Sequence, residues 1–69
     1  MPRISIIRTG RAKKGYTQKD LGELMNRSAN SIRAWEAGIH IPKVTDIIKL
    51  QSILDIPLDE LMNEFKGVE

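Results

Sequence analysis

The 69-residue sequence contains no cysteine, and this absence excludes disulfide bonds and thiolate metal sites. A single histidine, His40, is too few for an imidazole-rich metal site, and we expect no metal and no other cofactor. No apolar run exceeds two residues, so we expect neither a membrane span nor a signal peptide. These absences predict a protein of a reducing compartment, most simply the cytoplasm, with no membrane partner.

The chain is short, and its charge is unevenly divided. We expect one domain over residues 1–69, stabilised by regular helix packing and by dimerisation. Residues 1–43 hold nine Lys or Arg against three acids, whereas residues 44–69 hold two against six. The halves therefore carry net charges of +6 and −4. A domain with this polarity presents a basic surface to a polyanion, so nucleic acid is a candidate partner.

Apolar residues at helical spacing predict five short helices, over about residues 4–14, 17–26, 28–36, 45–54 and 58–65. Thr17 and Asp20 have the spacing of a capping box at the start of the second helix. Gly15 and Gly38 are suited to end the first and third helices. The predicted fold class is all-α, a compact bundle of about five helices.

The most informative stretch is TQKDLGELMNRSANSIRAWEAGIHIP, from Thr17 to Pro42. Eleven positions fit one pattern in fixed register: Thr17, Gln18, Leu21, Gly22, Met25, Ser28, Ile32, Trp35, Glu36, Gly38 and Pro42. This pattern resembles the helix-turn-helix of the phage repressor and Cro family, also called the xenobiotic response element type. The resemblance extends outward from this stretch to nearly the whole chain. It implies a lambda-repressor-like domain that binds double-stranded DNA and regulates transcription, without catalytic activity or a small-molecule ligand.

The third helix is the expected recognition helix, because its two faces differ. Ile32 and Trp35 share the face that packs on the core, and rotation by about 100° per residue places short or polar side chains opposite them. An outward face with one amide and one guanidinium suits the major groove, where Asn reads adenine and Arg reads guanine. The expected base-reading residues are Ala29, Asn30, Arg33 and Ala34.

Other residues are expected to position the protein on the DNA backbone. Gln18 matches the family position that contacts a phosphate, and a helix N-terminus favours an anion. The expected phosphate-positioning residues are Thr17, Gln18, Ser28, His40 and Lys43. Arg11 and Glu36 match a family pair that forms a partly buried salt bridge, so we assign them to structure.

The resemblance also implies a homodimer on a pseudo-palindromic operator, since one recognition helix reads too few base pairs to select a site. Family members pair two such helices about 34 Å apart. Apolar residues near the C-terminus are the candidate dimer interface, namely Leu58, Met62 and Phe65.

Three positions depart from the family pattern. Gly10 replaces an apolar residue, Arg27 replaces an apolar turn residue, and Asp55 stands where glycine is common. These departures bear on stability and turn geometry rather than on the positions expected to face DNA.

Two alternative functions share the same residues. A DNA-binding antitoxin or a restriction-modification controller would use the same domain with a second protein partner, which co-purification would reveal. A protein-interaction module would keep the fold without binding DNA, and would lack salt-dependent retention on DNA. The basic first 43 residues argue against the protein-interaction module.

Overall fold

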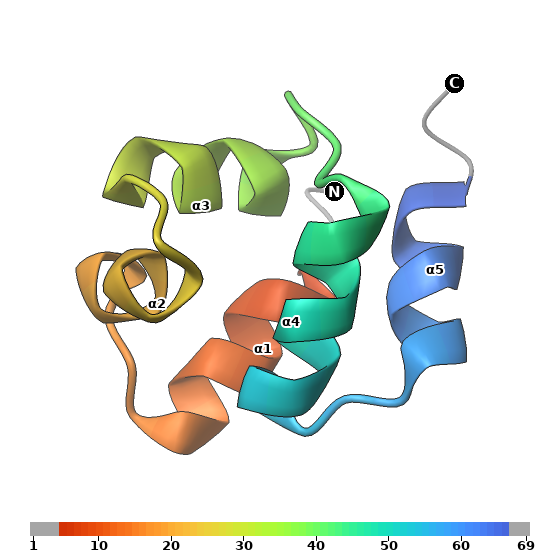
Figure 1. Cartoon of the computed structure of the whole chain (residues 1–69), viewed down its shortest axis with the longest axis horizontal. Coiled ribbons are helices and arrows are strands. Elements are labelled where there is room, and N and C mark those ends of the chain that lie inside the picture. The colour runs from red at the N-terminus through yellow and green to blue at the C-terminus, as the bar shows by residue number, and fades with distance from the viewer. Residues whose placement is uncertain (1–4, 67–69) are drawn as a thin grey trace.

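Five helices and no strands make up residues 5–66, the part of the chain that the computed structural model describes (Figure 1). In chain order they are α1 (Ile6–Lys14), α2 (Gln18–Met25), α3 (Ala29–Ala37), α4 (Val44–Leu54) and α5 (Leu58–Lys66). The predicted all-α class is confirmed. The first helix begins at Ile6, after the extended N-cap Ser5, two residues later than predicted, and α4 begins one residue earlier than predicted. Among the described helices, none is both long and apolar enough to cross a membrane.

Hydroxyl groups begin the first three helices. The side chains of Ser5, Thr17 and Ser28 accept hydrogen bonds from backbone N–H groups two or three residues ahead, at 3.0–3.2 Å. At α2 the Asp20 carboxylate accepts the Thr17 backbone N–H at 3.0 Å, which completes the predicted capping box. This backbone hydrogen bond favours the carboxylate form and lowers the pKa of the Asp20 carboxyl below its ordinary value.

The first four helices end on a residue in the left-handed conformation. Two are glycines, Gly15 and Gly38, with φ of 75° and 77°. The other two are Asn26 and Asp55, with φ of 58° and 56°. Glycine adopts this backbone conformation without a steric penalty, whereas a residue with a Cβ atom adopts it at a steric cost. Asp55 therefore gives α4 a weaker C-terminal stop than the glycine common in the family.

The core lies around α1 and α4, which pack together in the middle of the molecule. Helices α2 and α3 cover one side of this pair, and α5 covers the other (Figure 1). Each helix contributes to the set of most deeply buried side chains: Ile7, Leu21, Met25, Ile32, Leu50 and Leu61. Because α3 is held to the core mainly by its inner face, its outer face stays exposed.

Gly10 and Ile56 fit together where α1 passes the segment between α4 and α5. A Cβ atom on Gly10 would lie 2.7 Å from Ile56 Cδ1 and 3.4 Å from Leu54 Cβ. Helix propensity alone marks Gly10 as a weak point that costs about 1 kcal/mol relative to alanine. The structure shows what the glycine permits, since the Ile56 side chain packs against the α1 backbone and is 8% exposed.

Candidate nucleic-acid interface

Helix α3 lies along one edge of the molecule, with one face in the core and the other in solvent (Figure 1). Ile32 and Trp35 are 0% and 6% exposed and hold the helix to the core. On the outer side Ala34 is partly exposed, and the exposed residues are Ala29, Asn30, Arg33 and Ala37. This outer face is small enough to approach base edges, and its amide and guanidinium supply the donors and the acceptor needed to read them.

The turn between α2 and α3 has no room for a side chain at Gly22. A Cβ atom there would lie 2.7 Å from the Arg27 carbonyl oxygen and 3.2 Å from the Ser28 carbonyl carbon. The Arg27 N–H also donates to the Gly22 carbonyl oxygen at 2.7 Å. Because these contacts are made by backbone atoms, no rotamer change relieves them. Gly22 therefore determines how closely α3 follows α2 and how α3 projects from the molecule.

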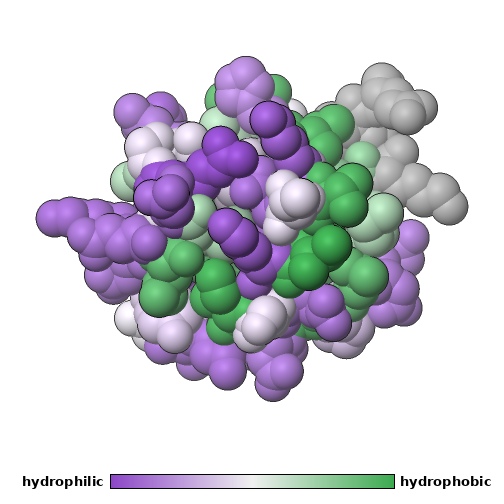
Figure 2. Space-filling model, viewed as in Figure 1, coloured by the Kyte–Doolittle hydropathy of each residue, from purple (hydrophilic) through white to green (hydrophobic). Residues whose placement is uncertain are grey.

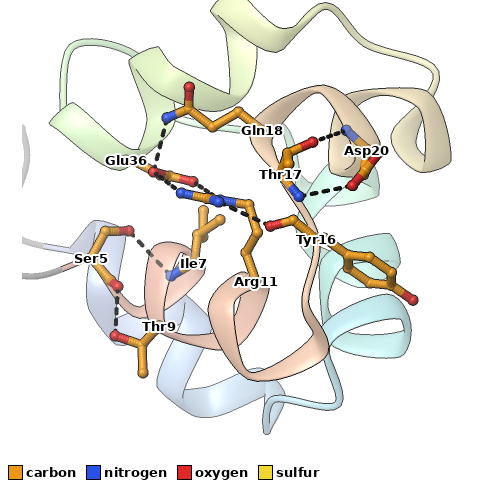
Figure 3. A network of polar contacts seen from close by, with 9 residues as sticks. All are labelled: Ser5, Ile7, Thr9, Arg11, Tyr16, Thr17, Gln18, Asp20 and Glu36. Atoms are coloured by element: carbon orange, nitrogen blue, oxygen red, sulfur yellow. Dashed lines mark hydrogen bonds and ion pairs between the residues drawn. The ribbon is translucent and has the colours of Figure 1, made fainter.

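Arg11 and Glu36 form an ion pair between α1 and α3 (Figure 3). The Arg11 guanidinium donates to the two Glu36 carboxylate oxygens at 2.8 and 3.2 Å, and to the Tyr16 carbonyl oxygen at 2.9 Å. The two side chains are only 15% and 8% exposed. This pair fixes the C-terminal half of α3 against α1.

Gln18 belongs to the same network and stands at the start of α2. Its Nε2 donates to Glu36 Oε1 at 3.2 Å, so the side chain reaches from α2 to α3 (Figure 3). A side-chain amide nitrogen carries two hydrogens, and this contact uses one of them. The other hydrogen remains able to bind a phosphate oxygen, and the carboxylate already restricts the rotamers of Gln18.

The other four phosphate-positioning candidates are all exposed, namely Thr17, Ser28, His40 and Lys43. The Thr17 and Ser28 hydroxyls both accept capping hydrogen bonds, and the Thr17 hydroxyl retains its own hydrogen for donation. The Ser28 hydroxyl also shares a hydrogen bond of 3.2 Å with the Ser31 hydroxyl. His40 and Lys43 lie in the loop between α3 and α4 and line a hollow of about 150 Å³ together with Ser31 of α3. The structure therefore places these four groups at the start of α2, at the start of α3 and beside α3.

An ion pair between Arg27 and Asp46 is a contact that the sequence analysis missed. The Arg27 guanidinium donates to both Asp46 carboxylate oxygens, with the shortest distance 2.8 Å, and the Lys43 backbone N–H donates to Oδ2 at 3.2 Å. The Asp46 side chain is 5% exposed and the Arg27 side chain 38%. The pair ties the turn before α3 to the start of α4. The sequence feature that indicated such a pair was Arg27 itself, because the family that the sequence resembles has an apolar residue at this position.

The dimer candidates differ in what they expose. Leu58 and Met62 are 40% and 46% exposed, whereas Phe65 is 7% exposed and packs in the core. Ile41 and Val44 were not among the predicted interface residues, but they are 47% and 63% exposed and line an apolar groove with Met62. Figure 2 shows this apolar surface over α4 and beside α5. Of the three candidates, Leu58 and Met62 are therefore the most exposed, while Phe65 contributes to the lining of the groove.

Within residues 5–66, no three histidine or acidic side chains gather as a metal site would require.

A comparison with known families identifies the family to which the chain is similar. A family model described as a helix-turn-helix, of the Cro/C1 type, matches residues 7–61. The match runs from the first turn of α1 into α5 and includes all of α2, α3 and α4. No significant match came from curated proteins or from solved structures.

Proposed function

Because the chain belongs to the Cro/C1-type helix-turn-helix family, a family of DNA-binding transcription regulators, we propose that it is a sequence-specific regulator of the repressor or Cro type. In this proposal α3 enters the major groove of double-stranded DNA. The observation that carries the proposal is the exposed face of α3, where Asn30 and Arg33 stand among short alanine side chains. No catalytic step is assigned to the protein, and its compartment is that of its DNA, most simply the cytoplasm.

The exposed groups divide into two roles in this proposal. Asn30 and Arg33 read base edges, with Ala29 and Ala34 allowing close approach and apolar contact with a thymine methyl group. Gln18 and Lys43, with Thr17, Ser28 and His40, hold phosphates and thereby fix the register of α3 on the duplex. The two roles have different thermodynamic signatures, because only base contacts depend on sequence.

Alanine variants of Asn30 and Lys43 should lose DNA affinity in different ways. Asn30→Ala should weaken binding to an operator selected from random DNA by about 1 to 3 kcal/mol, with little effect on random duplex DNA. Lys43→Ala should weaken binding to both DNAs alike and reduce the slope of log affinity against log salt by about one unit. The measurement is a titration of both DNAs at two or more salt concentrations.

Lys49→Ala is the matched control, since Lys49 is an exposed lysine on α4, outside the proposed interface. It should leave the salt slope close to that of the wild type. A wild-type protein whose binding to duplex DNA does not respond to salt would refute the DNA-binding role. Equal losses on operator and random DNA for Asn30→Ala would refute the placement of α3 in the groove.

We propose that the protein acts as a homodimer, with Leu58 and Met62 in the interface. An aspartate at position 62 would bring an unpaired charge into that interface, so Met62→Asp should weaken self-association by at least about tenfold. Leu24→Asp is the control, because Leu24 is 52% exposed on α2 and lies outside the proposed interface. Sedimentation equilibrium of the three proteins tests this expectation. A wild type that stays monomeric at high micromolar concentration and binds its operator as one molecule would contradict it.

A further inference from the structure

A hollow of about 190 Å³ lies where the first turn of α1, the start of α2 and the second half of α3 meet. It is lined by Ser5, Arg8, Gln18, Arg33, Glu36 and Ala37. Two of these residues, Gln18 and Arg33, have proposed contacts with DNA. The hollow therefore borders the proposed interface and extends it to α1, a helix outside the base-reading and phosphate-positioning sets.

The free charge at this hollow is positive. Arg8 and Arg33 are exposed, and neither makes an ion pair or a side-chain hydrogen bond within residues 5–66. The acid at the hollow, Glu36, is 8% exposed and already accepts hydrogen bonds from Arg11 and Gln18. Among the described residues, two guanidinium groups thus line one hollow without an acidic partner, a charge arrangement that an incoming anion would stabilise.

Arg8 also occupies an unfavourable place in its own helix. It is the third residue of α1, and the first turn of α1 contains no acid. The backbone N–H groups at a helix N-terminus carry partial positive charge, so an anionic side chain is preferred there. Glu64 of α5 accepts the Ile6 N–H at 3.2 Å, which partly offsets this charge at the start of the helix. Neither the position of Arg8 in its helix nor an ion pair within the described residues explains a cation there. Such a residue is a candidate for a functional role.

We propose that Arg8 is a further DNA contact that holds a phosphate oxygen at this hollow, beside Gln18 and Arg33. A guanidinium can donate two parallel N–H groups to a phosphate. The contact would add α1 to the surface that borders the groove entered by α3. This inference rests on the proposed function, because the phosphate is one of the DNA backbone.

Arg8→Ala should weaken binding to selected operator and to random duplex DNA by the same factor. One phosphate contact contributes about 0.9 to the slope of log affinity against log salt, through counterion release. Loss of that contact should therefore lower the binding constant about eightfold at 0.1 M salt, relative to its effect at 1 M. Arg8→Glu should weaken binding further. Both variants should melt at or above the wild-type temperature, since they remove a cation from a helix N-terminus. Stability and DNA affinity thus change in opposite directions, which a structural role for Arg8 would not produce.

Lys14→Ala is the matched control. Lys14 is exposed, carries the same charge and lies six residues further along α1, about 9 Å away along the helix axis. Its removal should leave the salt slope unchanged. If the wild type binds DNA and Arg8→Ala behaves like Lys14→Ala, the Arg8 contact alone is refuted. A loss on the operator without a loss on random DNA would refute the phosphate assignment. Absence of wild-type binding would overturn the proposed function and this contact together.

Discussion

Replacing Arg11 by methionine should lower the free energy of unfolding by about 3 kcal/mol and the Tm by at least about 10 °C. The Glu36 side chain is 8% exposed in the wild type, and the substitution leaves it the Gln18 amide as its side-chain donor within the described residues. A carboxylate taken out of water without a cation is strongly unfavourable, and this penalty exceeds the loss of the pair attraction alone. Thermal and urea denaturation measure the change.

The double variant Arg11→Met/Glu36→Met separates the penalty of an unpaired buried carboxylate from the loss of attraction within the ion pair. It removes both charges and replaces them by apolar side chains, so it should unfold at a higher temperature than Arg11→Met. In Arg11→Met the free energy of DNA binding, corrected for the folded fraction, should change much less than the free energy of unfolding. The reason is that neither residue of the pair has a proposed contact with DNA. Unchanged melting temperatures in both Arg11→Met and Glu36→Met would disprove the structural assignment.

Local signals in the sequence were sufficient for most of the fold. The capping box at Thr17 and Asp20 depends on residues three apart, and the stops at Gly15 and Gly38 depend on one residue each. Such short-range rules hold because hydrogen bonds at helix ends form within one turn. The separation of Ile32 and Trp35 from Asn30 likewise follows from helical periodicity alone.

Contacts between distant residues were not predictable in the same way. The fit of Ile56 against Gly10 joins segments 46 residues apart, and nothing near either residue marks the other. The Arg27–Asp46 pair joins the turn before α3 to the start of α4, where the aspartate alone reads as a first-turn acid. The hollow at Arg8 and Arg33 depends on how α1 and α3 pack. In each case tertiary packing, rather than local propensity, decides the partner.

Replacing Arg27 by methionine should destabilise the protein by about 3 kcal/mol, and more than replacing Asp46 by asparagine. The order follows from unequal exposure. In the wild type the Arg27 side chain is 38% exposed and the Asp46 side chain 5%. The guanidinium left unpaired by Asp46→Asn can therefore be hydrated, whereas the carboxylate left unpaired by Arg27→Met lies in a largely buried position. The donor that remains to that carboxylate is the Lys43 backbone N–H.

Arg33→Met is the matched control for Arg27→Met, because it removes the same charge with the same substitution six residues further along, in α3. Arg33 is exposed and makes no ion pair within the described residues, so its removal should change stability by no more than about 0.5 kcal/mol. Its DNA affinity should nevertheless fall, whereas folded Arg27→Met should retain most of its own. Equal melting temperatures for the two variants would show that the Arg27–Asp46 pair does not hold the turn to α4. If Arg27→Met loses stability but keeps its DNA affinity, and Arg33→Met does the reverse, Arg27 is assigned to the fold and Arg33 to DNA binding.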